Sequence, residues 1–122
     1  MFSTNLEFNS NARAAMDFYA NVFSYEIVEE TDIWLWENGT VAHGEITIYG
    51  NRLQFSDVEH IVTGYNGFSF SINLTDENEL RNRYNKMSVD AEIIMPLGKV
   101  DWSECYGLLK DKFGVQWQFN LD

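Results

Sequence analysis

The residues best placed to do chemistry are His43 and Glu45, which stand two positions apart in the segment Ala42-His43-Gly44-Glu45. On a β-strand this spacing puts both side chains on one face. An imidazole beside a carboxylate can transfer a proton, contact a ligand, or contribute two ligands to a metal ion. Two ligands are fewer than the three that a catalytic zinc normally takes from protein. The structural interpretation, which stays open, is that His43 hydrogen-bonds to Glu45 or to a neighbouring strand.

A second candidate pair is Trp102 and Tyr106, which share one face of an extended segment. Two aromatic side chains on one face can wall a pocket for a flat or apolar ligand, or they can simply pack in a core. Cys105 points to the opposite face with no histidine near it in sequence, which favours a small buried residue over a nucleophile. Ser103 lacks the strand-turn-helix context of a hydrolase nucleophile.

Composition limits the classes of partner. The chain has 122 residues, of which 45% are hydrophobic and 16% aromatic, and this suffices for one ordinary domain with a core. Nineteen acidic residues against eight Lys and Arg give a net charge of −11. That charge repels nucleic acid and anionic membranes, so neither is expected as a partner. A single cysteine and the lack of a signal-like N-terminus predict a cytoplasmic protein.

The first half of the chain predicts a strand, a helix and three further strands. Residues alternate in polarity from Phe2 to Phe8, and Asn9-Ser10-Asn11 then offers residues that can cap a helix. One apolar helix face is predicted from helical spacing: Ala15, Phe18, Tyr19, Val22 and Phe23. Three extended segments follow, near Tyr25–Trp36, Val41–Tyr49 and Arg52–Ser56.

The second half repeats this order. A strand around 68–74 is followed by a helix that Thr75 is expected to cap, with Leu80, Tyr84 and Met87 as its buried stripe. Extended segments are predicted near 91–95, 100–110 and 115–121, with Pro96 marking a break. A tight turn is predicted at 111–114. The same order of elements twice in one short chain indicates a duplicated βαβββ unit.

Polar residues alternate with apolar ones in the central strands. If helices cover the apolar faces, Ala42, Ile46, Ile48, Leu53 and Phe55 turn toward a helix. The opposite face then carries His43, Glu45, Thr47, Tyr49, Gln54 and Ser56 in the first half and Gln116, Gln118 and Asn120 in the second. Such a polar inner face favours a wet ligand cavity, although a dimer partner or plain solvent exposure would also explain it.

Three features together resemble the vicinal oxygen chelate superfamily, the glyoxalase/bleomycin-resistance/dioxygenase group. They are the run Trp102–Trp117, the segment Ala14–Phe23 and the duplicated βαβββ order. The resemblance is greatest to the PhnB-like branch, in which a histidine is typical at the position of His43. It implies an α+β fold of two βαβββ modules whose curved mixed sheets enclose a cavity.

The resemblance also implies where a divalent metal would bind. Metal-dependent members take His and Glu ligands from the first and last strand of each module. In this chain those places fall near Ser3, Gln54, Ser69 and Gln118, none of which is charged or an imidazole. Such donors suit a divalent ion poorly. We therefore expect no metal and no cofactor.

These observations predict one glyoxalase-like domain with modules at about 1–57 and 67–122 and a linker at 58–66. The predicted function is metal-free binding of a small organic ligand by a homodimer. The pocket candidates are His43, Glu45, Gln54, Trp102, Tyr106 and Gln118. One alternative is a lyase, isomerase or dioxygenase that uses His43 and Glu45, with or without a divalent metal. Another is a structural or regulatory dimer without a ligand. A methyltransferase label is sometimes given to this branch, but nothing in the sequence resembles a methyl-donor site.

Overall fold

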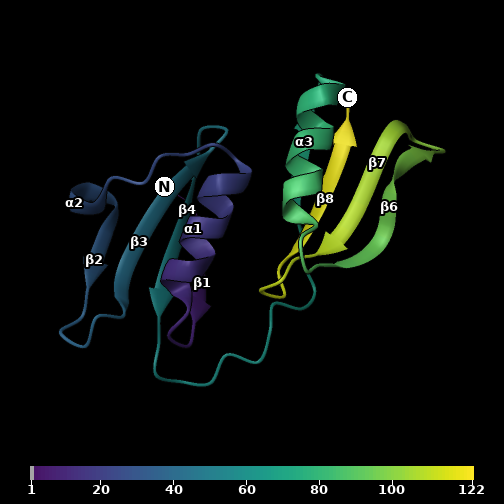
Figure 1. Ribbon diagram of the computed structural model, residues 1–122. Helices are drawn as coiled ribbons and strands as arrows, with labels where there is room; N and C mark the ends of the chain where they lie inside the picture. The colour runs from purple at the N-terminus through teal and green to yellow at the C-terminus, as the bar shows by residue number, and fades with distance from the viewer. Residues whose placement is uncertain (1) are drawn as a thin grey trace. The chain divides into compact units, whose positions relative to one another are not determined.

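The computed structural model describes residues 2–122, which divide into two compact units, unit 1 up to Thr63 and unit 2 from Gly64 to Asp122 (Figure 1). Each unit contains one four-stranded mixed sheet and one long helix. The elements of unit 1 are β1 (Thr4–Phe8), α1 (Ala12–Val22), α2 (Glu29–Asp32), β2 (Ile33–Leu35), β3 (Val41–Ile48) and β4 (Asn51–Asp57). Those of unit 2 are β5 (Phe70–Leu74), α3 (Glu77–Met87), β6 (Glu92–Val100), β7 (Ser103–Lys110) and β8 (Gln116–Leu121).

The two sheets have the same topology. Strand order is β1-β4-β3-β2 in unit 1 and β5-β8-β7-β6 in unit 2. In each, the first and last strands pair in parallel and the other neighbours pair antiparallel. This confirms the predicted α+β fold of two βαβββ modules. Neither sheet closes on itself.

A glycine lies at the same place in both sheets, where a side chain of the long helix packs directly on the strand backbone. Gly44 of β3 pairs with Phe55, and Gly107 of β7 pairs with Phe119. A Cβ atom at Gly44 would lie 2.4 Å from the sulfur of Met16, and one at Gly107 would lie 2.7 Å from the ring of Tyr84. Hydrogen in place of a side chain therefore lets helix residues rest directly on the third strand.

The cores follow the predicted helix faces, with one correction. In α3 the buried residues are Leu80, Tyr84 and Met87, as predicted. In α1, Phe18 is only half-buried at the edge of the apolar face. Met16 and Tyr19 are fully buried at its centre, and the Tyr19 ring lies 5.9 Å from that of Phe55. Helical spacing identified the face, but it included Phe18 and omitted Met16.

Four local predictions are wrong, and two of them concern helices. The segment predicted as extended at Tyr25–Trp36 contains the short helix α2, where Asp32 accepts a hydrogen bond from the backbone N–H of Val28 at 2.9 Å. The N-cap of α3 is Asp76 rather than Thr75, because the Asp76 carboxylate accepts from the N–H of Glu79. Short polar side chains compete at helix starts, and spacing alone does not select between neighbours.

Pro96 does not interrupt its strand, contrary to the prediction. It lies inside β6, the edge strand of the second sheet. Pairing with β7 is irregular there, since Met95 pairs with Leu108 and Gly98 with Tyr106. An edge position with a bulge tolerates a residue that cannot donate to the ladder.

The predicted alternation of β3 also fails at its first residues. Gly44, Ile46 and Ile48 are buried as the helix-side residues, but Ala42 is half-buried and Val41 is buried instead. The register between β2 and β3 shifts at Trp34/Leu35, and this breaks the two-residue period near the hairpin.

The turn at 111–114 forms as predicted, and Asp111 holds it. This carboxylate is only 4% exposed and is the one buried charged side chain among residues 2–122. It accepts hydrogen bonds from the N–H groups of Phe113 and Val115 and from the indole of Trp117. A buried carboxylate with three donors fixes the register of the β7–β8 hairpin.

We expect Gly107→Ala to lower the free energy of unfolding by about 1–3 kcal/mol, because the new methyl group overlaps the rigid Tyr84 ring. Gly98→Ala is the matched control on the neighbouring strand, where the nearest atom is 4.0 Å from the added carbon. It should be neutral or slightly stabilising. Urea unfolding of both variants measures the difference. Equal midpoints would show that the helix does not rest on the strand as described.

Candidate functional site

One face of each sheet is free of that unit's long helix, and we call it the helix-free face. In β4, Leu53 and Phe55 are buried, whereas Gln54 between them is half-buried and points the other way. In β8, Trp117 and Phe119 are buried, and Gln118 alternates with them in the same manner. The sheet face opposite the long helix is therefore polar in both units, as the alternation in the sequence predicted.

A serine and a glutamine are hydrogen-bonded on each helix-free face. The Gln54 amide donates to the Ser3 hydroxyl at 2.6 Å, and the Gln118 amide donates to the Ser69 hydroxyl at 2.7 Å. The two pairs are equivalent, since Gln54 lies opposite Asn5 and Gln118 opposite Ser71, two residues beyond each serine. The four positions at which the family resemblance implied metal ligands therefore form two hydrogen-bonded pairs, one in each unit.

These pairs do not suit a divalent metal. All four side chains are neutral, and each glutamine amide already donates to its serine. A partly dry site needs ligand charge to compensate a divalent ion. Within residues 2–122, no group of three or more His, Cys, Asp or Glu side chains is placed to hold a metal ion.

The second helix-free face extends its pair into a chain of hydrogen bonds. The Tyr106 hydroxyl donates to the Gln118 carbonyl at 2.8 Å, so Tyr106, Gln118 and Ser69 are linked in sequence. Trp102, which is 65% exposed, stacks edge-on against Tyr106 with ring centroids 5.2 Å apart. Four predicted or implied site residues therefore come together here, one exposed aromatic and three linked polar groups.

Asn120 adds an acceptor that sequence reasoning did not single out. Its Cα is paired with that of Tyr106, and its amide nitrogen donates to Asp122 at 3.1 Å. Its Oδ1 atom is buried and accepts no hydrogen bond in the described part of the chain. A buried acceptor without a donor costs free energy, so a donor from water or a ligand is expected there.

In unit 1, His43 occupies the position that Tyr106 has in unit 2, since each precedes the glycine of its sheet. The His43 Nε2 atom lies 2.9 Å from Glu45 Oε1, which confirms the hydrogen bond that was one of the interpretations from sequence. Glu45 also lies 3.6 Å from Arg52, and the Trp34 ring lies 5.4 Å from the imidazole. The side chains of His43 and Glu45 are 37% and 33% exposed, so this pair is accessible to a ligand.

Arg52 and Trp34 were missed as members of this cluster. Arg52 stands two residues before Gln54, so strand alternation could have placed it on the same face. Trp34 is paired with His43 across β2 and β3, which needs the strand register and is not visible in the sequence. Arg52 places a cation beside Glu45, and Trp34 places an aromatic ring beside His43.

Cys105 is excluded as a nucleophile by its position. It is fully buried, and burial raises the pKa of its thiol, so less of the reactive thiolate forms. This agrees with the expectation of a small buried residue. Separately, no helix among residues 2–122 is both long enough and apolar enough to cross a membrane.

We expect the melting temperature to stay within about one degree on addition of stoichiometric nickel, zinc or manganese. The reason is that Ser3–Gln54 and Ser69–Gln118 supply no negative charge to an ion, and only binding to the folded state raises stability. Differential scanning fluorimetry of protein first treated with EDTA makes the measurement. A rise of several degrees that Gln54→Ala or Gln118→Ala abolishes would contradict the neutral-site account.

Tyr19→Ala should destabilise the protein by about 3–5 kcal/mol, because it removes a fully buried aromatic ring. His43→Ala should cost about 1 kcal/mol or less, since it removes one part-exposed hydrogen bond. Chemical denaturation of the two variants compares them. Similar losses would mean that the helix-side and helix-free faces of unit 1 are inverted.

Comparison with known proteins identifies the family. The family described as 3-demethylubiquinone-9 3-methyltransferase matches residues 1–120. The chain is 33% identical to a putative 3-demethylubiquinone-9 3-methyltransferase, PhnB protein, from Bacillus cereus, with a TM-score of 0.87 over 99% of this chain and 98% of that one. Protein YjdN of Escherichia coli is 26% identical over 82 residues, which span 66% of this chain and 56% of that protein.

More distant structures share the fold. Protein PA1353 from Pseudomonas aeruginosa has a TM-score of 0.85 at 23% identity, covering 100% of this chain and 97% of that one. A glyoxalase/bleomycin resistance protein/dioxygenase family enzyme from Burkholderia phytofirmans has a TM-score of 0.70 at 11% identity, covering 98% and 95%. The chain therefore belongs to the PhnB-like family described as 3-demethylubiquinone-9 3-methyltransferase, and it shares the fold of the glyoxalase/bleomycin resistance/dioxygenase structures.

Proposed function

We propose that this protein binds a small, uncharged aromatic molecule on its helix-free faces without a metal. The observation that carries the proposal is the unit 2 cluster, where exposed Trp102 stands beside the Tyr106–Gln118–Ser69 chain. A flat ligand can stack on the indole while polar groups fix its orientation, the usual division of labour in small-molecule sites.

The unpaired Oδ1 atom of Asn120 limits the kinds of ligand that would suit this face. It calls for a ligand, or an ordered water bound with the ligand, that donates an N–H or O–H group. The Gln118 amide donates to Ser69, and its carbonyl accepts from Tyr106. These three side chains therefore hold one another in place by hydrogen bonds before a ligand binds. Aromatic amides and phenols combine a flat face with such a donor.

The proposal is tested by titrating a panel of phenols and aromatic amides, including 4-hydroxybenzamide, while recording heat and melting temperature. Trp102→Ala and Gln118→Ala should each weaken binding by roughly 5- to 150-fold, since stacking of a flat ring on an indole and a lost part-buried hydrogen bond are each worth about 1–3 kcal/mol. Asn82→Ala on the exposed side of α3 is the matched amide deletion and should leave binding unchanged. Equal effects of Gln118→Ala and Asn82→Ala would reject this site.

A second candidate is acid–base catalysis by His43 and Glu45. The 2.9 Å contact supports it, because a carboxylate that orients an imidazole is a common arrangement for proton transfer. His43→Gln would abolish such an activity while preserving ligand affinity at Trp102. Retained turnover in His43→Gln would remove this candidate.

The family description names a methyl transfer, and the described residues do not fit a methyl-donor nucleotide. Each sheet of four strands carries one long helix, on a single face. Nucleotide cofactors of doubly wound folds bind in a crevice at the carboxyl ends of parallel strands flanked by helices on both faces.

We further propose that two copies associate in solution. The edge strand β2 leaves Trp34 and Leu35 50% and 59% exposed, and β6 leaves Ile93 and Ile94 44% and 43% exposed. Apolar edge strands are usually covered by another chain. Sedimentation at micromolar concentration should give twice the chain mass of 14.2 kDa. A single species at the mass of one chain would contradict association.

A further inference from the structure

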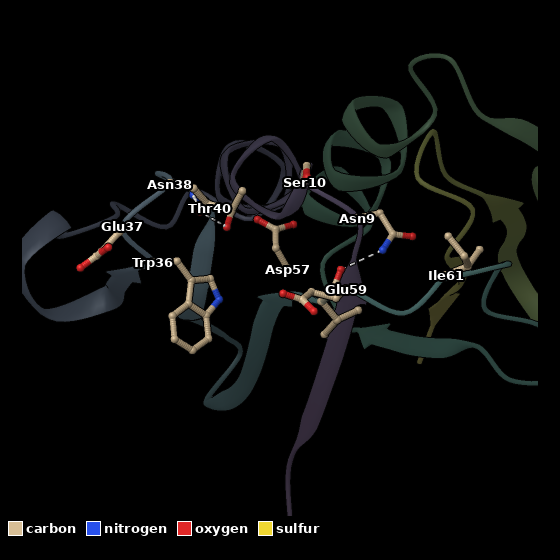
Figure 2. A pocket seen from close by; sticks show the side chains of 10 residues that line it. Asn9, Ser10, Trp36, Glu37, Asn38, Thr40, Asp57, Glu59 and Ile61 are labelled. Atoms are coloured by element: carbon tan, nitrogen blue, oxygen red, sulfur yellow. Dashed lines mark hydrogen bonds between the residues drawn. The ribbon is translucent and has the colours of Figure 1, made fainter.

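A depression on unit 1 lies apart from the candidate site and shares none of its residues (Figure 2). Its volume is about 930 Å³. It is formed by the residues after β1, the β2–β3 hairpin with Trp36 and Glu37, the end of β4 at Asp57, and the segment after it with Glu59 and Ile61. All of these elements belong to one unit, so the depression is complete within 9–61.

The walls of this depression are fixed by hydrogen bonds. The Asn9 amide donates to the carbonyls of Val58 and His60 at 3.0 and 2.9 Å, and its oxygen accepts from the N–H of Val62. The Asp57 carboxylate accepts from the N–H groups of Ala12 and Val41 at 3.1 and 2.9 Å. One amide thus pins the segment after β4, and one carboxylate ties the start of α1 to the start of β3. The walls are preformed, which lowers the entropy cost of binding.

The chemistry of the lining is aromatic and anionic. Trp36 is 58% exposed and Ile61 is 78% exposed, so one aromatic and one aliphatic residue of the lining face solvent. Asp57, Glu59 and Glu37 supply carboxylates, and none of the ten lining residues is Lys, Arg or His. Figure 2 shows the carboxylates of Asp57 and Glu59 between the Trp36 indole and Asn9, whereas the Glu37 carboxylate points away. Glu59 forms no ion pair with any described residue.

An organic cation fits this lining better than a metal ion. Both oxygens of Asp57 already accept backbone N–H groups, and an indole is not a metal ligand. An exposed tryptophan face attracts ammonium and guanidinium groups, and this attraction adds to that of a nearby carboxylate. The net charge of −11 raises the local concentration of cations further. Apolar Ile61 suits the carbon part of such a molecule.

We propose that this depression is a second binding site, which takes a small organic cation with an ammonium or guanidinium head. The head lies against the Trp36 indole and pairs with the Glu59 carboxylate, while Asp57 adds negative charge from behind. This site is separate from the aromatic site proposed above, so either can fail without the other.

The test follows the Trp36 indole N–H signal by NMR during titration with choline, benzylamine and agmatine. We expect at least one of them to shift that signal saturably. The neutral isostere of choline, 3,3-dimethylbutan-1-ol, should bind at least 10-fold more weakly, because it has the same shape without the charge. Loss of the signal in Trp36→Phe assigns it.

Variants locate the site by affinity measured calorimetrically. Trp36→Leu should weaken binding of the cation on the order of 10-fold and Trp36→Phe less, since a phenyl ring keeps a π face. Glu59→Gln should weaken it roughly 3- to 10-fold, whereas Glu30→Gln, the same charge change on exposed α2, should change it less than twofold. Equal binding of choline and its isostere, equal effects of Glu59→Gln and Glu30→Gln, or no shift with any of the three cations would each overturn the proposal.

Discussion

The rest of the structure depends on one helix side chain that packs directly on a glycine in the third strand of each sheet. Gly44 and Gly107 leave room for Met16 and Tyr84, and the paired Phe55 and Phe119 are buried beside them. Because strand side chains alternate, burying this set commits every intervening residue to the opposite face. A single steric requirement, met twice, therefore decides which side chains are available for binding.

The two helix-free faces share one arrangement of polar side chains but differ in charge. Both carry a serine–glutamine pair at the same register. The residue before Gly44 is His43, which is hydrogen-bonded to the acidic Glu45, and the residue before Gly107 is Tyr106, which is hydrogen-bonded to the neutral Gln118. Unit 1 thus offers a group that can exchange a proton, and unit 2 offers a neutral aromatic frame.

The sequence predicted what strand and helix periodicity control. In each sheet, alternation placed a glutamine, Gln54 or Gln118, on the helix-free face. It placed Leu53 and Trp117 on the helix side of their sheets, as observed. It failed where another constraint prevails. An edge bulge accommodates Pro96, the Asp32 carboxylate supports α2 by accepting a hydrogen bond from the Val28 N–H, and a hairpin irregularity displaces Ala42.

Contacts between segments distant in sequence were beyond prediction. Asn9 was read only as a residue that can cap a helix, yet its amide holds the segment after β4 and so builds the depression. The partners of Gln118 and the unpaired oxygen of Asn120 depend on the pairing of β7, β8 and β5. Such features follow from register, which a single sequence does not specify.

The central claim is that the Ser–Gln pairs serve an organic ligand and not a metal ion. The most direct measurement is the side-chain amide spectrum of Gln54 and Gln118 in ¹⁵N-labelled protein, recorded with added manganese and then with an aromatic amide. Manganese broadens signals near its binding site strongly. The account predicts that the Gln118 amide shifts with the aromatic amide and that neither glutamine broadens selectively with manganese. Selective broadening of Gln54 or Gln118 at one equivalent of manganese would contradict it.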